Sequence, residues 1–169
     1  ERTLTAFPRL SIRQRSSSAS RPVSMCMRVM GLDIGEKRIG VAIADTATGI
    51  AVPLRVMDAR DVLGNTRSWR ALVQDNEPDM LVCGLPKTMR GDTGGQARRV
   101  RDCAERIAQT CGLPLEFADE RLSSAEAKRL LREQGLSECE MRGKVDSVAA
   151  SLFLETWIAR NGEDKMEER

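Results

Sequence analysis

Short apolar runs separated by polar turns occupy the chain between residues 28 and 57. The runs cover residues 28–34, 39–44 and 50–57, and polar, glycine-containing turns separate them. Apolar runs of this length, joined by tight turns, are typical of strands in an antiparallel meander. The pattern therefore predicts three successive antiparallel strands.

Beyond residue 60 the spacing of the apolar positions becomes that of helices and buried strands. Helices are expected over residues 62–76, 96–110 and 123–134 and from about residue 143, with strands at 80–84 and 115–118. Val100, Ala104 and Ile107 share one helical face, and Ser123 with Glu126 has capping-box spacing. Three antiparallel strands followed by alternating helices and parallel strands predict an α/β protein with an RNase H-like fold. Its five-stranded mixed sheet should be flanked by helices.

The N-terminal segment differs in composition from the rest. Residues 1–24 contain five arginines, several serines and one acid, and no sustained apolar period. This composition fits an organelle transit peptide or a non-native extension, and the start at Glu1 ahead of Met25, Met27 and Met30 favours the second. We expect one domain over residues 28–160, between a disordered or non-native segment at 1–24 and a polar tail at 161–169.

Composition excludes several kinds of site. The chain contains no histidine and no tyrosine, which excludes a Ser-His-Asp or Cys-His catalytic arrangement, His-ligated zinc and a tyrosine stacking platform. The five cysteines lack C-x-x-C spacing and are expected to be reduced thiols. No apolar run approaches the roughly 18 residues that cross a membrane.

Net charge gives little guidance to partners. The chain has 27 basic and 25 acidic residues, and residues 25–169 alone have 22 and 24. Nucleic acid would therefore have to be bound through a local patch and metal ions, because the overall field of the domain does not attract it.

Three acids stand at positions that suggest a shared site. Asp33 lies in an apolar strand, on the face of Val29 and Gly31; Glu120 follows a strand; and Asp146 lies in the first turn of the last helix. Taken singly, each has a structural explanation: a strand-end turn, a solvated charge cluster and a favourable helix dipole. Together, they could converge at one sheet edge, where their mutual repulsion would require Mg²⁺ or Mn²⁺. Two such ions roughly 4 Å apart would support phosphodiester cleavage.

Basic residues accompany each acid and the glycine-rich loop at 86–95. In that loop, Gly94 and Gly95 precede a helix, so free N–H groups there can face a phosphate. A phosphate backbone held over a metal site would need cations of this kind. The candidate substrate-binding residues are Lys37, Arg38, Lys87, Arg90, Arg121 and Lys144.

Four motifs, in order, resemble those of the YqgF/RuvX family. They are Gly-Leu-Asp-Ile-Gly-Glu-Lys-Arg-Ile-Gly-Val-Ala at 31–42, Gly-Leu-Pro at 84–86, Asp-Glu-Arg-Leu-Ser-Ser at 119–124 and Lys-Val-Asp-Ser at 144–147. The resemblance spans about residues 28–160 and implies an RNase H-like fold and a divalent-metal nuclease in the cytoplasm. It also implies a role in processing the 5′ end of pre-16S rRNA.

Other functions stay open on the sequence alone. One is a Holliday junction resolvase-like nuclease acting on branched DNA, and another is a non-catalytic RNase H-like factor that binds nucleic acid. The sequence does not decide between RNA and DNA or between monomer and homodimer. Cytoplasmic location is expected over organelle import through residues 1–24.

Overall fold

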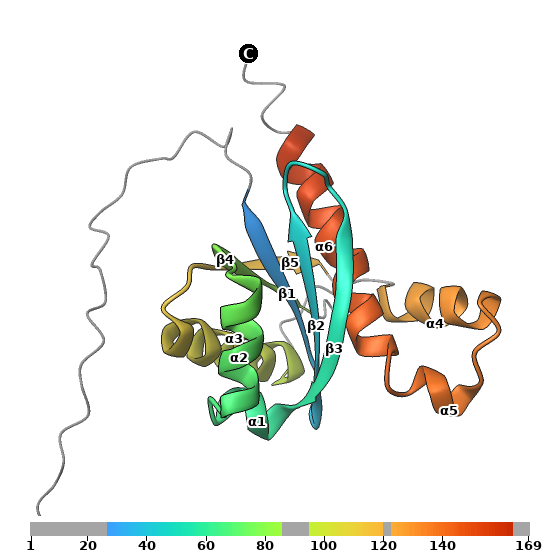
Figure 1. Ribbon diagram of the computed structural model, residues 1–169, viewed down its shortest axis with the longest axis horizontal. Helices are drawn as coiled ribbons and strands as arrows, with labels where there is room; N and C mark the ends of the chain where they lie inside the picture. Colours follow the sequence, from blue (N-terminus) through green and yellow to red (C-terminus); the bar gives the residue numbers. More distant parts are fainter. Residues whose placement is uncertain (1–26, 86–94, 120–122, 164–169) are drawn as a thin grey trace, which may run out of the picture.

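The computed structural model describes residues 27–85, 95–119 and 123–163. The chain forms the elements β1 (Arg28–Ile34), β2 (Arg38–Asp45), β3 (Ala51–Asp58), α1 (Ala59–Leu63), α2 (Arg67–Asn76), β4 (Met80–Leu85), α3 (Gly95–Cys111), β5 (Leu115–Asp119), α4 (Ser123–Glu133), α5 (Glu138–Met141) and α6 (Val145–Glu163). Figure 1 shows their arrangement around a twisted central sheet.

The sheet has five strands in the order β3-β2-β1-β4-β5. β1 pairs antiparallel with β2, and β2 pairs antiparallel with β3. β4 pairs parallel with β1 and with β5. This topology confirms the predicted meander and the RNase H-like fold class. β1 is the middle strand, and its residues Val29, Met30 and Leu32 are fully buried.

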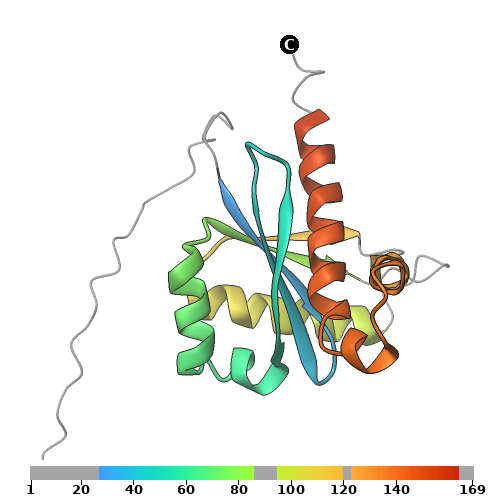
Figure 2. The ribbon, with the colours of Figure 1, turned by 45° about the vertical axis from the view of Figure 1, so that its right-hand side comes forward.

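The two faces of the sheet are covered by different helices (Figures 1 and 2). On one face, Met30 and Leu32 of β1 belong to a core cluster with Trp69 of α2 and Ile107 of α3. On the other face, a second cluster includes Phe153 and Leu154 of α6 together with β-strand residues. The inner strands β1 and β4 therefore alternate their side chains between two apolar layers, which explains why their sequences are almost continuously apolar.

α6 approaches the sheet closely because the residues beneath it are small. A Cβ atom on Gly31 would lie 3.2 Å from the Leu154 side chain. The contact at Gly40 is closer still, because a Cβ there would lie 2.1 Å from the backbone carbon and oxygen of Asp146. Only glycine at position 40 therefore allows the first turn of α6 to rest on β2.

α4 and α5 lie beside α6, on its side away from β1 and β2 (Figure 2). Ala127, Leu131 and Met141 are buried there, and Arg129 forms ion pairs with Glu126 and Glu133 along α4. Of the helices in the described ranges, none is long and apolar enough to cross a membrane.

Three details differ from the sequence-based expectations. The helix expected over 62–76 is divided into α1 and α2, because Gly64 and left-handed Asn65 (φ 49°) interrupt it. The short helix α5, which begins with a capping box between Ser137 and Glu140, was not predicted. α6 continues through Gly162 to Glu163, into the segment predicted as a polar tail.

The contact at Gly40 gives the first prediction. Replacing Gly40 by Ala places a methyl group against the backbone of Asp146, so α6 must shift from the sheet. We expect the free energy of unfolding to fall by at least about 2 kcal/mol, a cost typical of inserting a methyl group into a well-packed core. Urea denaturation measures the change. The matched control is Gly95→Ala, since a Cβ at Gly95 meets no atom within 4 Å. Equal unfolding midpoints for the two variants would contradict the assigned contact.

Candidate active site

Asp33 lies near the carboxyl end of the middle strand and faces α6. It is 9% exposed, and in the β1–β2 register it stands opposite Gly40. It shares its face with Val29, which packs in the α6-side cluster, and with Gly31, which touches α6. The predicted face of Asp33 is therefore confirmed.

Asp146 approaches the same glycine from the opposite layer. It belongs to the first turn of α6, the turn whose backbone lies over Gly40. Its side chain is 25% exposed. Because Gly40 is the register partner of Asp33 and the contact point of Asp146, the fold brings these two acids to one place. They are 113 positions apart in the sequence.

Arg38 is the charged partner of Asp146. Its Nε lies 3.2 Å from Oδ2 of Asp146, and its Nη1 donates a hydrogen bond of 2.9 Å to the carbonyl oxygen of Arg142. Two acceptors thus orient the guanidinium, whose side chain is still 50% exposed. The ion pair offsets part of the electrostatic cost of placing Asp146 beside another acid.

The third acid of the hypothesis, Glu120, lies outside the described residues. β5 ends at Asp119, the residue before it. Ala118 packs against the cluster on the α6 side. β1, β4 and β5 are parallel, so their carboxyl ends meet at one sheet edge. Within the described ranges, no three acids or cysteines are grouped so as to hold a metal ion.

The predicted cations are divided between described and undescribed segments. Lys37, in the β1–β2 turn, and Lys144, just before α6, are exposed. Lys87, Arg90 and Arg121 lie outside the described residues. The structure adds one contact that sequence reasoning missed: Arg99, at the start of α3, binds Glu36 in the β1–β2 turn at 2.9 Å. This contact ties the helix that follows the glycine-rich loop to the strand pair that carries Asp33 and Arg38.

The described cysteines do not offer a nucleophile to this site. Cys83, Cys103, Cys111 and Cys139 form no disulfide with one another. Burial raises the pKa of the Cys111 thiol, which keeps it protonated and unreactive near neutral pH. Among the described residues, the carboxylates Asp33 and Asp146 are the groups that the fold brings together at the sheet edge.

Comparisons with known proteins agree with the motifs. A protein from Anaeromyxobacter sp. (strain Fw109-5), named "Putative pre-16S rRNA nuclease", is 44% identical over 132 residues, which cover 78% of this chain and 96% of that protein. A protein of the same name from Acaryochloris marina is 41% identical over 129 residues, 76% of this chain and 90% of that protein.

Among solved structures, Thermus thermophilus RuvC in complex with a Holliday junction substrate has a TM-score of 0.48. Its sequence is 16% identical, and the match covers 80% of this chain and 96% of that one. A likeness this distant supports no functional conclusion. The family model described as "RuvX: Holliday junction resolvase" matches residues 27–160. With the relatives above, this match shows that the chain belongs to the RuvX (YqgF) family.

Proposed function

We propose that this protein is a metal-dependent nuclease that cleaves phosphodiester bonds and processes the 5′ end of pre-16S rRNA. The observation that supports the proposal most directly is the meeting of Asp33 and Asp146 around Gly40. Relatives at about 40% identity are named for the same activity. The described cysteines form no disulfide with one another, which suits the reducing cytoplasm, where we place the protein.

The donor groups present suit Mg²⁺ or Mn²⁺. Asp33 and Asp146 supply carboxylate oxygens, the ligands that these hard cations prefer. Both carboxylates are largely withdrawn from water, an environment in which a bound cation stabilises their charged form. We propose Glu120 as the third ligand. A divalent ion bound there would activate water for hydrolysis and stabilise the leaving oxygen.

The basic residues would hold the phosphate backbone over these acids. Lys37 and Lys144 are both exposed. The Arg38 side chain is half exposed, so its guanidinium can contact a phosphate while it remains paired with Asp146. Lys87, Arg90 and Arg121 complete the proposed set. Cations near a carboxylate site position the substrate without specifying its sequence.

A second candidate is a nuclease acting on branched DNA. The description of the matching family model names a Holliday junction resolvase. Cleavage of a symmetric junction at two positions would require the two active sites of a homodimer, whereas cleavage of RNA at one position requires a single active site. The substrate comparison below therefore separates the two candidates.

Carboxylate replacement gives the second prediction. Asp33→Asn and Asp146→Asn should each lower kcat on a pre-16S rRNA fragment at least about a hundredfold, since even outer-shell changes at metal sites cost 10–100-fold. Mn²⁺ should raise the Tm of the wild type and not of the variants, because the ligand set is broken. The control is Asp75→Asn, an exposed acid on α2.

The outcomes of this experiment discriminate between the functions. Equal background cleavage by the wild type and the variants would indicate that the protein is a non-catalytic factor that binds nucleic acid. Faster metal-dependent cleavage of a four-way DNA junction than of the rRNA fragment would favour the resolvase candidate.

The third prediction concerns the loop cations. Replacing Lys87 and Arg90 by Ala should weaken RNA binding and flatten the slope of log K against log salt by about 1.4, since each lost single-strand phosphate contact accounts for about 0.7. At saturating RNA the rate should return to near the wild-type value. These cations are expected to bind substrate and transition state equally, so their loss raises KM and leaves kcat nearly unchanged. The matched double control is Arg67→Ala with Arg106→Ala, two exposed arginines of α2 and α3. Loss of kcat with intact binding would place the loop in the catalytic apparatus.

A further inference from the structure

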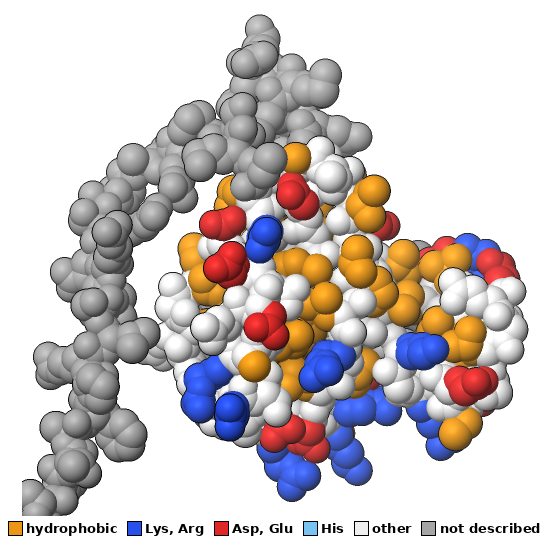
Figure 3. All heavy atoms as spheres, in the orientation of Figure 1, with side chains coloured by type: hydrophobic (Ala, Val, Ile, Leu, Met, Phe, Trp, Pro, Cys, Tyr) orange, Lys and Arg blue, Asp and Glu red, His pale blue; other side chains and the backbone are white. Residues whose placement is uncertain are grey.

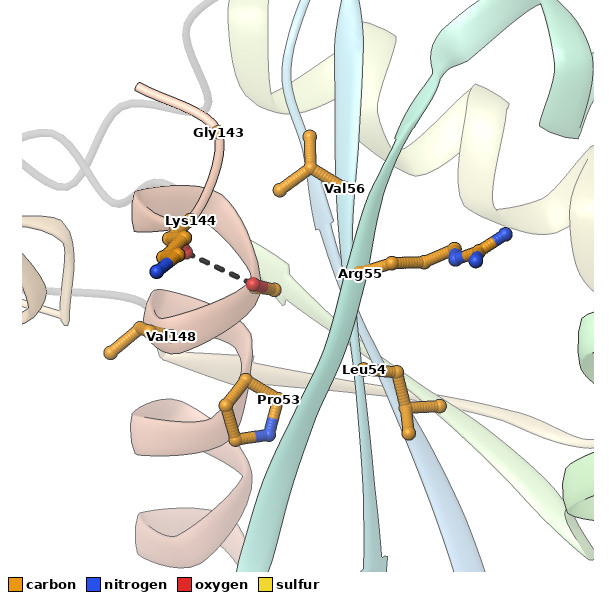
Figure 4. Close-up of a pocket in the computed structure, with 8 residues that line it drawn as sticks. Pro53, Leu54, Arg55, Val56, Gly143, Lys144 and Val148 are labelled. Carbon is orange, nitrogen blue, oxygen red and sulfur yellow. Dashed lines mark hydrogen bonds between the residues drawn. The ribbon is translucent and has the colours of Figure 1, made fainter. Parts of the chain in front are cut away.

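A groove of about 400 Å³ runs between β3 and the first turns of α6. Pro53 and Val56 form its wall on β3, and Lys144, Ser147 and Val148 form its wall on α6. Figure 4 shows Pro53 and Val56 on the side of β3 that faces α6, whereas the side chains of Lys144 and Val148 lie along the outer side of α6 in this view. Its volume is within the range of small-ligand sites.

The groove is continuous with the candidate active site. Val56 is the register partner of Gly40, and Gly40 is the partner of Asp33. The three residues form one row across the sheet, so Val56 lies about 10 Å from Asp33 at a strand spacing of about 4.8 Å. On the other wall, Lys144 and Ser147 flank Asp146 along the chain. A strand of nucleic acid leaving the acids in this direction would enter the groove.

The lining has the chemistry of a nucleotide site. It contains Lys144 and Arg55 and no acid, and Arg55 points to the far side of β3 (Figure 4). Pro53, Val56 and Val148 offer aliphatic surface for a base or ribose. Figure 3 shows hydrophobic side chains gathered over β3 and α6, with basic side chains below them. The hydroxyl of Ser147 donates to the Lys144 carbonyl at 3.0 Å and so helps to fix the first turn of α6.

Strand addition by a second chain is a poor alternative occupant. β3 is an edge strand, but Pro53 has no N–H to donate, and a bulge interrupts the register between Val41 and Ala42 opposite it. Both features are known to blunt an edge against pairing with another strand. The groove is lined by a few residues of one strand and of the first turns of one helix, and its small volume suits a single strand.

We propose that this groove binds single-stranded RNA that flanks the scissile phosphate. The proposal rests on the proposed function, because it makes the groove an extension of the same site. Lys144 pairs with a phosphate, and the bases or riboses of the flank pack on Pro53 and Val148. The nuclease therefore prefers cleavage sites with an unpaired extension on the side that leads toward β3.

A binding assay tests this directly. An RNA hairpin from pre-16S rRNA is prepared blunt, with a 5′ extension or with a 3′ extension, and its affinity is measured by fluorescence anisotropy in EDTA, so that no cleavage occurs. The wild type should bind one extended RNA about tenfold tighter than the blunt RNA. Val148→Glu should abolish that gain through charge repulsion and leave the affinity for blunt RNA within twofold. Pro53→Glu, an exposed change on the other wall, should do the same.

The matched control is Ala159→Glu, the same added charge at an exposed position of α6 distant from the groove. It should behave as the wild type. Equal binding of all RNAs by the wild type, or the same loss for blunt and extended RNA in both groove variants, would overturn the proposal. So would a wild-type dimer, seen by light scattering, that Val148→Glu converts to monomer. Because EDTA removes cleavage from the assay, a failure of the nuclease function appears separately, in the Asp33→Asn comparison.

Discussion

The close contact between Gly40 and the first turn of α6 is the constraint on which the site depends. Without a side chain at position 40, the backbone of Asp146 rests directly on β2. Ala42 and Ala44 continue the same face of β2 as small residues, so the helix stays close along its length. Since Gly40 is also the neighbour of Asp33, this packing contact brings two carboxylates together from the middle strand and the last helix.

That arrangement has an electrostatic cost, which neighbouring residues help to offset. Two acids withdrawn from water repel each other more strongly than they would at an exposed surface. Arg38 compensates Asp146 from the same face of β2, and the Arg142 carbonyl fixes its guanidinium. A site of this kind is organised before any ligand arrives, because strands, a helix turn and an ion pair all hold its groups in place.

Sequence reasoning found the elements and the acids but not the contacts between them. Apolar periodicity placed the strands of the meander because both faces of the sheet are buried. It missed the break between α1 and α2, since Gly64 and Asn65 alone do not reveal a left-handed turn. The role of Gly40 depends on the register of β1 with β2 and on the path of α6. The Arg38–Asp146 pair likewise joins residues far apart in the chain. Motifs identified Asp33 and Asp146, while only three-dimensional packing shows why they meet.

The distribution of ion pairs explains how a domain of nearly balanced charge can attract a polyanion. Along α4 and α5 the charges compensate one another: Arg129 and Arg132 lower the pKa values of Glu126 and Glu138, respectively. Such surfaces present little net field. The lining of the β3–α6 groove, by contrast, contains no acid, and Lys144 is the cation on its α6 wall, since Arg55 points to the far side of β3. Where basic and acidic side chains pair with one another, their fields largely cancel. A polyanion is therefore attracted only to places where cations have no acidic neighbour. If the groove binds a phosphate backbone as proposed, the attraction comes from the position of a few cations such as Lys144, and the total charge of the chain has little influence.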